Sequence, residues 1–248
     1  MSGAWLSAMP IAIQQILTAR PNAKPKTMSI LAVGSVAFDN IVTPSGRADD
    51  VVGGSATYFS LAASYFTQVR VVAVVGEDFT AEHESVLTKR GVDVRGIQHA
   101  KGKTFRWGGQ YSENLNEAKT DFTELNVFEK FQPRIPEEYK DSEFLFLGNI
   151  HPHLQAAVRL ELPDVRLTGG DTMNFWIQGA NQELRETLRL VNILLINDGE
   201  AKMLAKESSL PRAARGRLDS LASILASPSL MRRMLTSRRV SISSWFAP

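Results

Sequence analysis

Asp39 and the adjacent pair Gly53 and Gly54 have the residue types and spacing of a site for a small polar ligand. Asp39 follows the apolar stretch 30–36, and the glycine pair precedes a segment in which apolar residues recur at helical spacing. In α/β proteins, ligands are held at strand ends and helix starts. Structural alternatives remain open: Asp39 could cap a helix or a turn, and the glycines could form a tight loop before the helix.

Polar residues also follow several other predicted strands. Glu77 and Asp78 come after one strand, Asn149 comes after another, and the cluster 197–200 comes after a third. Carboxyl ends of parallel strands share one edge of a sheet, so we expect a ligand crevice there. Asn149, and Asn174 after a weaker strand, could contact a substrate in this crevice or could cap turns.

The elements that must position these residues alternate between strands and helices. The apolar runs 30–36 and 69–75 read as buried strands, and the segments after Gly54 and over 80–90 read as helices. The alternation resumes with strands 144–147, 165–168 and 193–196 and with helices 154–162 and 181–190. This order predicts an α/β fold with a mostly parallel sheet covered by helices.

A different pattern occupies residues 96–128. Short stretches at 104–107 and 122–128 alternate polar and aromatic residues, which predicts a small accessory sheet that serves as a lid. The turn-forming residues 43–50 predict a loop that closes the first strand.

Composition places the chain among soluble globular proteins. It has 248 residues, of which 44% are hydrophobic and 22% charged, which suits one sizeable core. It has no cysteine, which excludes disulfides, thiolate metal sites and cysteine nucleophiles and is compatible with the cytoplasm. No apolar run approaches the ~20 residues that span a bilayer, so no transmembrane helix is expected.

The two ends of the chain differ from the part between them. Residues 1–27 contain no acid and read as an extension without fixed structure, or alternatively as an amphipathic organellar presequence, ahead of a domain over 28–210. Residues 211–248 contain seven arginines, eight serines and one acid, without a strand, turn and helix pattern. We interpret this Arg- and Ser-rich segment as an aberrant tail.

Taken together, the Asp39 stretch, the Gly53–Gly54 helix start, the segment VVAVVGEDF and the Asn197-x-x-Glu200 spacing resemble the ribokinase-like (PfkB) family of carbohydrate and nucleoside kinases. The resemblance covers about 28–210. It implies a doubly wound α/β domain with a small β-lid, and transfer of the γ-phosphoryl group of ATP to a hydroxyl of a sugar or nucleoside with Mg²⁺. It also implies a possible homodimer through the lid and a cytoplasmic location.

The resemblance implies roles for the acceptor residues. Asp39 would accept hydrogen bonds from sugar hydroxyls, because a carboxylate can hold two of them at once. Gly53 and Gly54 would let the backbone approach the sugar where a Cβ atom would intrude. Tyr58 stands where many sugar kinases have an asparagine, so a phenol replaces an amide and the identity of the sugar stays open.

Asn197 and Glu200 match the family's N-x-x-E motif, which orders hydrated Mg²⁺ and the phosphates. Oxygen ligands suit Mg²⁺, which keeps several waters. The structural alternative is that Asn197 caps the helix that carries Glu200.

One motif of the family is missing from the sequence. The family's chemistry resides in a late Asp-Thr-x-Gly-Ala-Gly-Asp segment, whose helix start stabilises charge on the transferring phosphoryl group. Here only Gly216 follows Gly199, and Asp219 has no glycine loop around it. We therefore assign no catalytic residue and expect that the chain diverges after about Arg215 through a frameshift or a comparable gene error. The fold would then be C-terminally incomplete, and the alternative function is a non-catalytic sugar-binding remnant.

Three other interpretations are not favoured. His151-Pro152-His153 has no evident third metal ligand. The arginines of 211–248 lack interleaved aromatics or a recognisable module, so we expect no nucleic-acid partner. The segment Val33-Gly34-Ser35-Val36 lacks the remainder of a dinucleotide-binding G-x-G-x-x-G turn.

Overall fold

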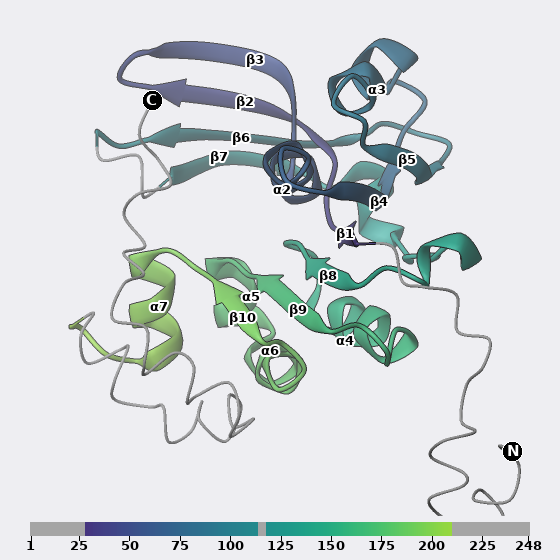
Figure 1. Cartoon of the computed structure of the whole chain (residues 1–248). Helices are drawn as coiled ribbons and strands as arrows, with labels where there is room; N and C mark the ends of the chain where they lie inside the picture. Colours follow the sequence, from purple (N-terminus) through teal and green to yellow (C-terminus); the bar gives the residue numbers. More distant parts are fainter. Residues whose placement is uncertain (1–27, 114–117, 210–248) are drawn as a thin grey trace, which may run out of the picture.

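The structure is a computed structural model that describes residues 28–113 and 118–209. Within these ranges the strands form two sheets, one six-stranded in the order β10-β9-β8-β1-β4-β5 and one four-stranded in the order β3-β2-β6-β7 (Figure 1). The strands are β1 (Ser29–Val33), β2 (Ala37–Thr43), β3 (Gly46–Gly53), β4 (Gln68–Val75), β5 (Asp93–His99), β6 (Phe105–Tyr111), β7 (Ala118–Glu124), β8 (Phe144–Leu147), β9 (Leu167–Asp171) and β10 (Ile193–Leu195).

Every strand pair of the six-stranded sheet is parallel. The helices that connect these strands are α2 (Ser55–Ala63), α3 (Ala81–Thr88), α4 (Pro152–Glu161), α5 (Asn174–Gly179), α6 (Asn181–Leu188) and α7 (Asp198–Ala205), with the 3-10 turns η2 (Asn126–Lys130) and η3 (Glu137–Tyr139). Because successive side chains of a strand point to opposite faces, the central strand β1 contributes side chains to two hydrophobic cores, one on each face of the sheet. Leu31 and Val33 pack with Val158 of α4, and Ala32 packs with Ala56 of α2 and Leu87 of α3. The predicted doubly wound α/β fold is confirmed.

The order of the strands reverses next to β1. From β1 the chain builds outward through β4 and β5, and then returns to the other side of β1 to add β8, β9 and β10. The carboxyl ends of β1 and β8 therefore flank a topological switch point, which is where open α/β sheets bind ligands.

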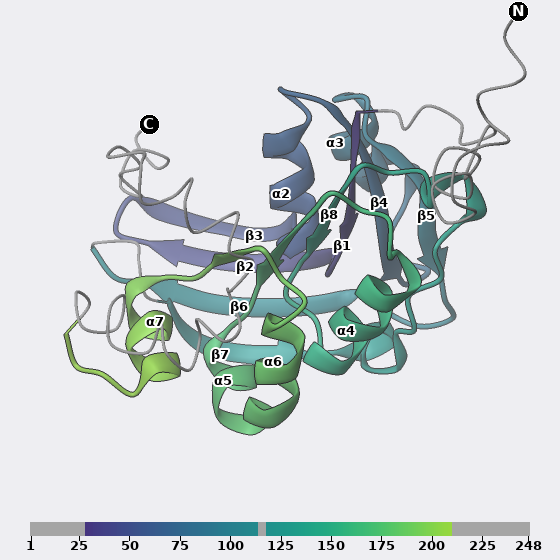
Figure 2. The ribbon, with the colours of Figure 1, turned by 60° about the horizontal axis from the view of Figure 1, so that its bottom comes forward.

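The four-stranded sheet is the lid, and its strands run across the direction of β1, β4 and β8 (Figure 2). β6 and β7 lie within the predicted range 96–128, but the hairpin of β2 and β3 belongs to the lid as well. Of the predicted loop at 43–50, residues 44 and 45 form a turn that follows β2, but 46–50 belong to β3. Residues 46–50 are polar because they form the exposed part of an edge strand.

Two further expectations for this region need correction. β5, which begins at Asp93, belongs to the main sheet, so the lid begins later than residue 96. The second predicted lid strand, 122–128, ends at Glu124 and continues into the 3-10 turn η2. In both places the strand is exposed or short. Its alternation of apolar and polar residues is therefore too weak for the sequence to define where the strand begins and ends.

The lid is attached to the main sheet through Asp78, which lies just after β4. One Asp78 oxygen, Oδ1, accepts hydrogen bonds from the Thr104 backbone N–H at 2.7 Å and from the Thr104 hydroxyl at 2.6 Å. The other oxygen, Oδ2, lies 3.6 Å from the guanidinium of Arg106 on β6. These contacts link the start of β6 to the segment that follows β4.

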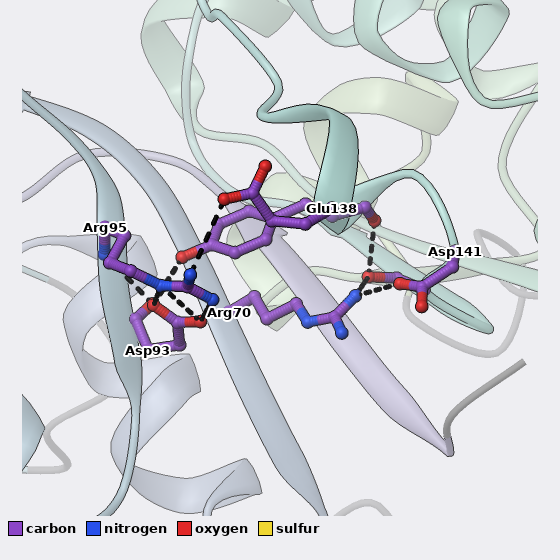
Figure 3. Close-up of polar contacts among 7 residues, drawn as sticks. Arg70, Asp93, Arg95, Glu138 and Asp141 are labelled. Atoms are coloured by element: carbon purple, nitrogen blue, oxygen red, sulfur yellow. Dashed lines mark hydrogen bonds and ion pairs between the residues drawn. The ribbon is translucent and has the colours of Figure 1, made fainter.

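A polar cluster holds η3 against the amino ends of β4 and β5 (Figure 3). The buried Tyr139 hydroxyl donates to Asp93 Oδ1 at 2.6 Å, and Arg95 binds the same carboxylate at 2.6 Å through Nη2. Arg70 forms an ion pair with Asp141. This cluster lies at the end of the sheet opposite to the strand ends discussed below.

None of the helices in the described part of the chain is long and apolar enough to cross a membrane. The predicted extension 1–27 and the predicted tail 211–248 lie outside the described residues.

Candidate functional site

Asp39 lies in the middle of β2, in the lid, and not at the end of a main-sheet strand as predicted. Asp39 is only 6% exposed to solvent. Oδ2 accepts hydrogen bonds from the Gly54 backbone N–H at 3.3 Å and from the Tyr58 hydroxyl at 3.2 Å. Burial raises the pKa of the Asp39 carboxyl, and the two hydrogen bonds oppose that shift.

Gly53 and Gly54 allow the lid hairpin to meet the start of α2. A Cβ atom on Gly53 would lie 2.0 Å from Asp39 Oδ2. Gly54 has φ +93°, and a Cβ there would lie 2.5 Å from the Ser35 carbonyl oxygen. Both positions therefore require glycine, because a side chain would displace either the carboxylate or the backbone at the end of β1.

A serine pair that the sequence analysis missed holds the switch point together. The Ser55 hydroxyl accepts hydrogen bonds from the backbone N–H of Ser35 at 3.2 Å and of Asn149 at 2.9 Å. The Ser35 hydroxyl in turn accepts from the Ser55 N–H at 3.0 Å. The first turn of α2 is thus tied to the residues that follow β1 and β8. The partners are up to 94 positions apart in sequence, so no local pattern could have revealed them.

Asn149 and Asn174 occupy different environments. The Asn149 side chain accepts from the Trp176 indole N–H at 2.8 Å and contacts the Met173 sulfur at 3.0 Å, so its amide is engaged with α5 and the residue before it. Asn174 is exposed at the first position of α5. The hydrogen bond from the Asn149 backbone N–H to Ser55 links Asn149 to the start of α2, next to the groups that bind Asp39. The described contacts include no such link for Asn174.

Asn197 and Glu200 form a second group at the start of α7. Each side chain bonds the other residue's backbone: Glu200 Oε2 accepts from the Asn197 N–H at 3.0 Å, and Asn197 Oδ1 accepts from the Glu200 N–H at 2.9 Å. This is a capping box, so the structural alternative for Asn197 is realised. Burial raises the pKa of Glu200, and the hydrogen bond from Asn197 opposes the shift.

Asp171, at the carboxyl end of β9, adds a second acid to this group. Burial and the negative charge of Glu200 raise the pKa of the Asp171 carboxyl to about 7. The sequence analysis gave Asp171 no role, since only the fold brings it near Glu200.

The chemistry of these oxygens fits Mg²⁺, the metal that the resemblance implies. Two carboxylates, Asp171 and Glu200, repel each other in a site that is poorly hydrated, and a divalent cation would relieve that repulsion. Mg²⁺ prefers oxygen ligands and binds through one or two carboxylates plus water and phosphate. The residues present therefore fit Mg²⁺. Among the described residues no cluster of three or more His, Cys, Asp or Glu side chains could enclose a metal by itself.

Trp107 and Tyr111 of β6 lie on the same side of the lid as Asp39, and the sequence analysis gave them no role in the site. Asp39 is directly opposite Trp107 in the parallel pairing of β2 with β6. Burial and then the negative charge of Asp39 raise the pKa of the Tyr111 hydroxyl.

No family model matches the chain. The arrangement of the two sheets defines a class of proteins nonetheless: the fold is ribokinase-like, because solved ribokinases superpose on it. Arabidopsis thaliana ribokinase, complexed with ribose and ATP, has a TM-score of 0.60 at 13% identity and covers 79% of this chain and 69% of its own. An Escherichia coli protein assigned as a ribokinase II, in complex with ATP and Mg²⁺, has a TM-score of 0.59 at 17% identity and covers 78% of this chain and 70% of its own.

One relative is also similar to this chain in sequence. The chain is 28% identical over 192 residues to the cytidine kinase of Thermococcus kodakarensis, which covers 76% of this chain and 68% of the relative. These similarities confirm the resemblance to the ribokinase-like (PfkB) carbohydrate and nucleoside kinases that the motifs predicted.

Proposed function

We propose that this protein is an ATP-dependent kinase that phosphorylates a hydroxyl of a sugar or nucleoside. The observation that carries the proposal is the buried Asp39 carboxylate, held by Gly54 and Tyr58 between the lid and the switch point of the sheet. The names of the similar proteins support it: they include a cytidine kinase and a ribokinase complexed with ribose and ATP.

Each group of residues has its own part in this proposal. Asp39 accepts hydrogen bonds from the hydroxyls of the acceptor, and Gly53 leaves the space that the Asp39 carboxylate occupies. Asp171 and Glu200 would hold Mg²⁺, in part through water, with Asn197 fixing the position of Glu200. When bound, Mg²⁺ with ATP supplies charge stabilisation for the transferred phosphoryl group.

A second candidate function is acceptor binding without phosphoryl transfer. It is favoured by the sequence after α7, in which Gly216 is the single glycine and no Gly-Ala-Gly-Asp segment occurs. Without such a helix start, no motif in the given sequence is recognised as stabilising charge on the phosphates or as taking the proton from the acceptor hydroxyl. We assign no catalytic base for this reason.

Two measurements on the full chain separate these candidates. ADP formation in a coupled assay with ATP, Mg²⁺ and a panel of sugars and nucleosides reports turnover, and calorimetry with the same panel reports binding. Turnover that is lost in Asp39→Ala supports the kinase. Binding without turnover supports the second candidate. If no sugar or nucleoside binds or reacts, both are contradicted.

The remaining features of the proposal follow from the resemblance. We propose a small-molecule acceptor, no nucleic-acid partner, a cytoplasmic location and a possible homodimer through the lid. Light scattering coupled to gel filtration tests the dimer, because a monomer at all concentrations would exclude it.

A further inference from the structure

An aromatic surface on the lid continues the site beyond Asp39. Trp107, Gly109 and Tyr111 alternate along β6, so they share one face of the lid, and Trp107 is paired directly with Asp39. The opposite face carries Gly108, which is covered by the Phe122 ring: a Cβ atom on Gly108 would lie 2.2 Å from that ring. The face that includes Asp39 therefore has its own aromatic residues, separate from those on the other side.

The Trp107 ring is held in place against the strand. A Cβ atom on Gly109 would lie 2.4 Å from the Trp107 ring atoms Cη2 and Cζ2, so the indole covers this glycine. Its N–H donates to the Thr120 hydroxyl at 3.3 Å, which fixes the ring toward β7. The Tyr111 ring lies beside it, with centroids 6.3 Å apart and planes at 68°. Trp107 and Tyr111 are partly exposed, so this aromatic surface is accessible to a ligand.

Polar and apolar groups are arranged in sequence along this face. Asp39 and the Tyr58 hydroxyl, 3.2 Å apart, offer hydrogen-bonding groups at one end. The Trp107 and Tyr111 rings, with centroids 6.3 Å apart, place a flat aromatic surface beside these groups. A ligand that matches both parts carries hydroxyls on one part and a flat, weakly polar group on another.

We propose that the acceptor is a nucleoside, whose ribose hydroxyls bind Asp39 and whose base lies against Trp107 and Tyr111. This inference rests on the proposed function of the same site. A base stacks on an aromatic side chain through its π-face, and this contact does not depend on which base is present. Trp107 and Tyr111 would therefore select nucleosides over free sugars without selecting strongly among bases.

Calorimetry on the full chain tests the inference without ATP, with cytidine, adenosine and ribose as ligands. We expect both nucleosides to bind more tightly than ribose. Trp107→Ala should weaken nucleoside binding about tenfold or more and leave ribose binding within about twofold. Tyr111→Ala should act in the same direction, whereas Trp107→Phe, which keeps a stacking face, should restore most of the affinity.

Phe122→Ala is the matched control, since it removes an aromatic ring from the other face of the lid and should leave all affinities unchanged. Circular dichroism and thermal unfolding identify any variant that fails to fold, in which case Tyr111→Ala and Trp107→Phe decide the outcome. The inference is overturned if ribose binds as tightly as the nucleosides, or if Trp107→Ala weakens both ligands equally. In either case acceptor binding itself survives. If neither ligand class binds, the proposed function fails as well.

Discussion

Asp39 illustrates how the fold prepares a single carboxylate for a ligand. Both hydrogen bonds described for its side chain fall on Oδ2, and they come from groups that are themselves fixed, a helix-start N–H and the phenol of Tyr58. Oδ1 is therefore available to a hydroxyl of the ligand. A buried carboxylate is costly to keep charged at 6% exposure, and we propose that hydroxyls of the acceptor offset this cost.

Replacing Asp39 with asparagine should weaken acceptor binding by about 1.5–3 kcal/mol, because a hydrogen bond to a charged acceptor is lost. In the wild type, affinity should fall as the pH is lowered through the Asp39 pKa, which burial raises above 3.8. Protonation removes the charged acceptor, and the asparagine variant should lack this pH dependence. Calorimetry between pH 4 and pH 8 measures both effects. A variant that keeps the wild-type pH profile would exclude Asp39 as the titrating group.

At the scale of elements, the start of α2 depends on Gly54. Gly54→Ala should lower the free energy of unfolding by about 1–3 kcal/mol, because the new Cβ meets the Ser35 carbonyl oxygen at a backbone angle that disfavours side chains. The control is Gly91→Ala, which also has positive φ but has nothing within 4 Å of its Cβ position. Urea unfolding should show the larger loss for Gly54→Ala. Equal losses would mean that the contact with Ser35 is unimportant.

The attachment of η3 to the sheet gives a prediction for acid pH. The hydrogen bond from Arg95, together with that from Tyr139, holds the pKa of Asp93 at about 2 although burial opposes the shift. A pKa that is lower in the folded state stabilises the protein above the unfolded value of 3.8, and this contribution is lost as the pH falls from about 4 toward 2. Arg95 is largely exposed, so we discount the contribution to about 1 kcal/mol.

Asp93→Asn should therefore lower the free energy of unfolding at pH 7 by about 1 kcal/mol, with a smaller difference from wild type at pH 3. Urea unfolding at pH 7, 5 and 3 measures it. Asp49→Asn is a matched control, because Asp49 forms an exposed pair with Arg47 at the same two-residue spacing and should have little effect at any pH. If the stability difference between Asp93→Asn and wild type grew as the pH fell, the pH dependence would have the opposite sign, and the role assigned to Asp93 would be refuted.

The main sheet could be predicted from sequence and the lid only in part. Strands such as 69–75 are buried on both faces, so they read as continuous apolar runs. The polar strand β3 has no such signal in its exposed half, and its partner β2 pairs on its other side with β6, more than 60 residues later. Pairing of this kind is decided by tertiary contacts, which local patterns do not contain.

The candidate site, too, could be predicted from the sequence only in part. Asp39, Gly53 and Gly54 were identified because a strand, a glycine pair and a helix follow one another in sequence. Asp171 and Trp107 were not assigned to the site, because each acquires a possible role only through a neighbour on another element. The roles of all these residues in binding remain predictions.

At the scale of the whole molecule, the lid and the main sheet are two layers joined at the site and at Asp78. Asp78→Asn removes the charge that binds Thr104 and Arg106, at a cost of about 1.5–3 kcal/mol for charged hydrogen bonds. We expect the lid to open more often. Hydrogen exchange should become about tenfold or more faster in β2 and β6, with the rates in β8 and β9 unchanged.

Asp121→Asn provides the control, because Asp121 lies on the lid strand β7 and accepts hydrogen bonds from Gln110 on the neighbouring lid strand. Its loss should not alter how the lid meets the sheet. A saturating acceptor should slow the exchange of the Asp78→Asn lid again, since a ligand bound to Asp39 also contacts the groups at the start of α2. If exchange accelerates equally in both layers, Asp78 supports global stability and does not control the lid. A selective change would show that the two layers move as separate bodies, and its reversal by the acceptor would show that acceptor binding holds them together.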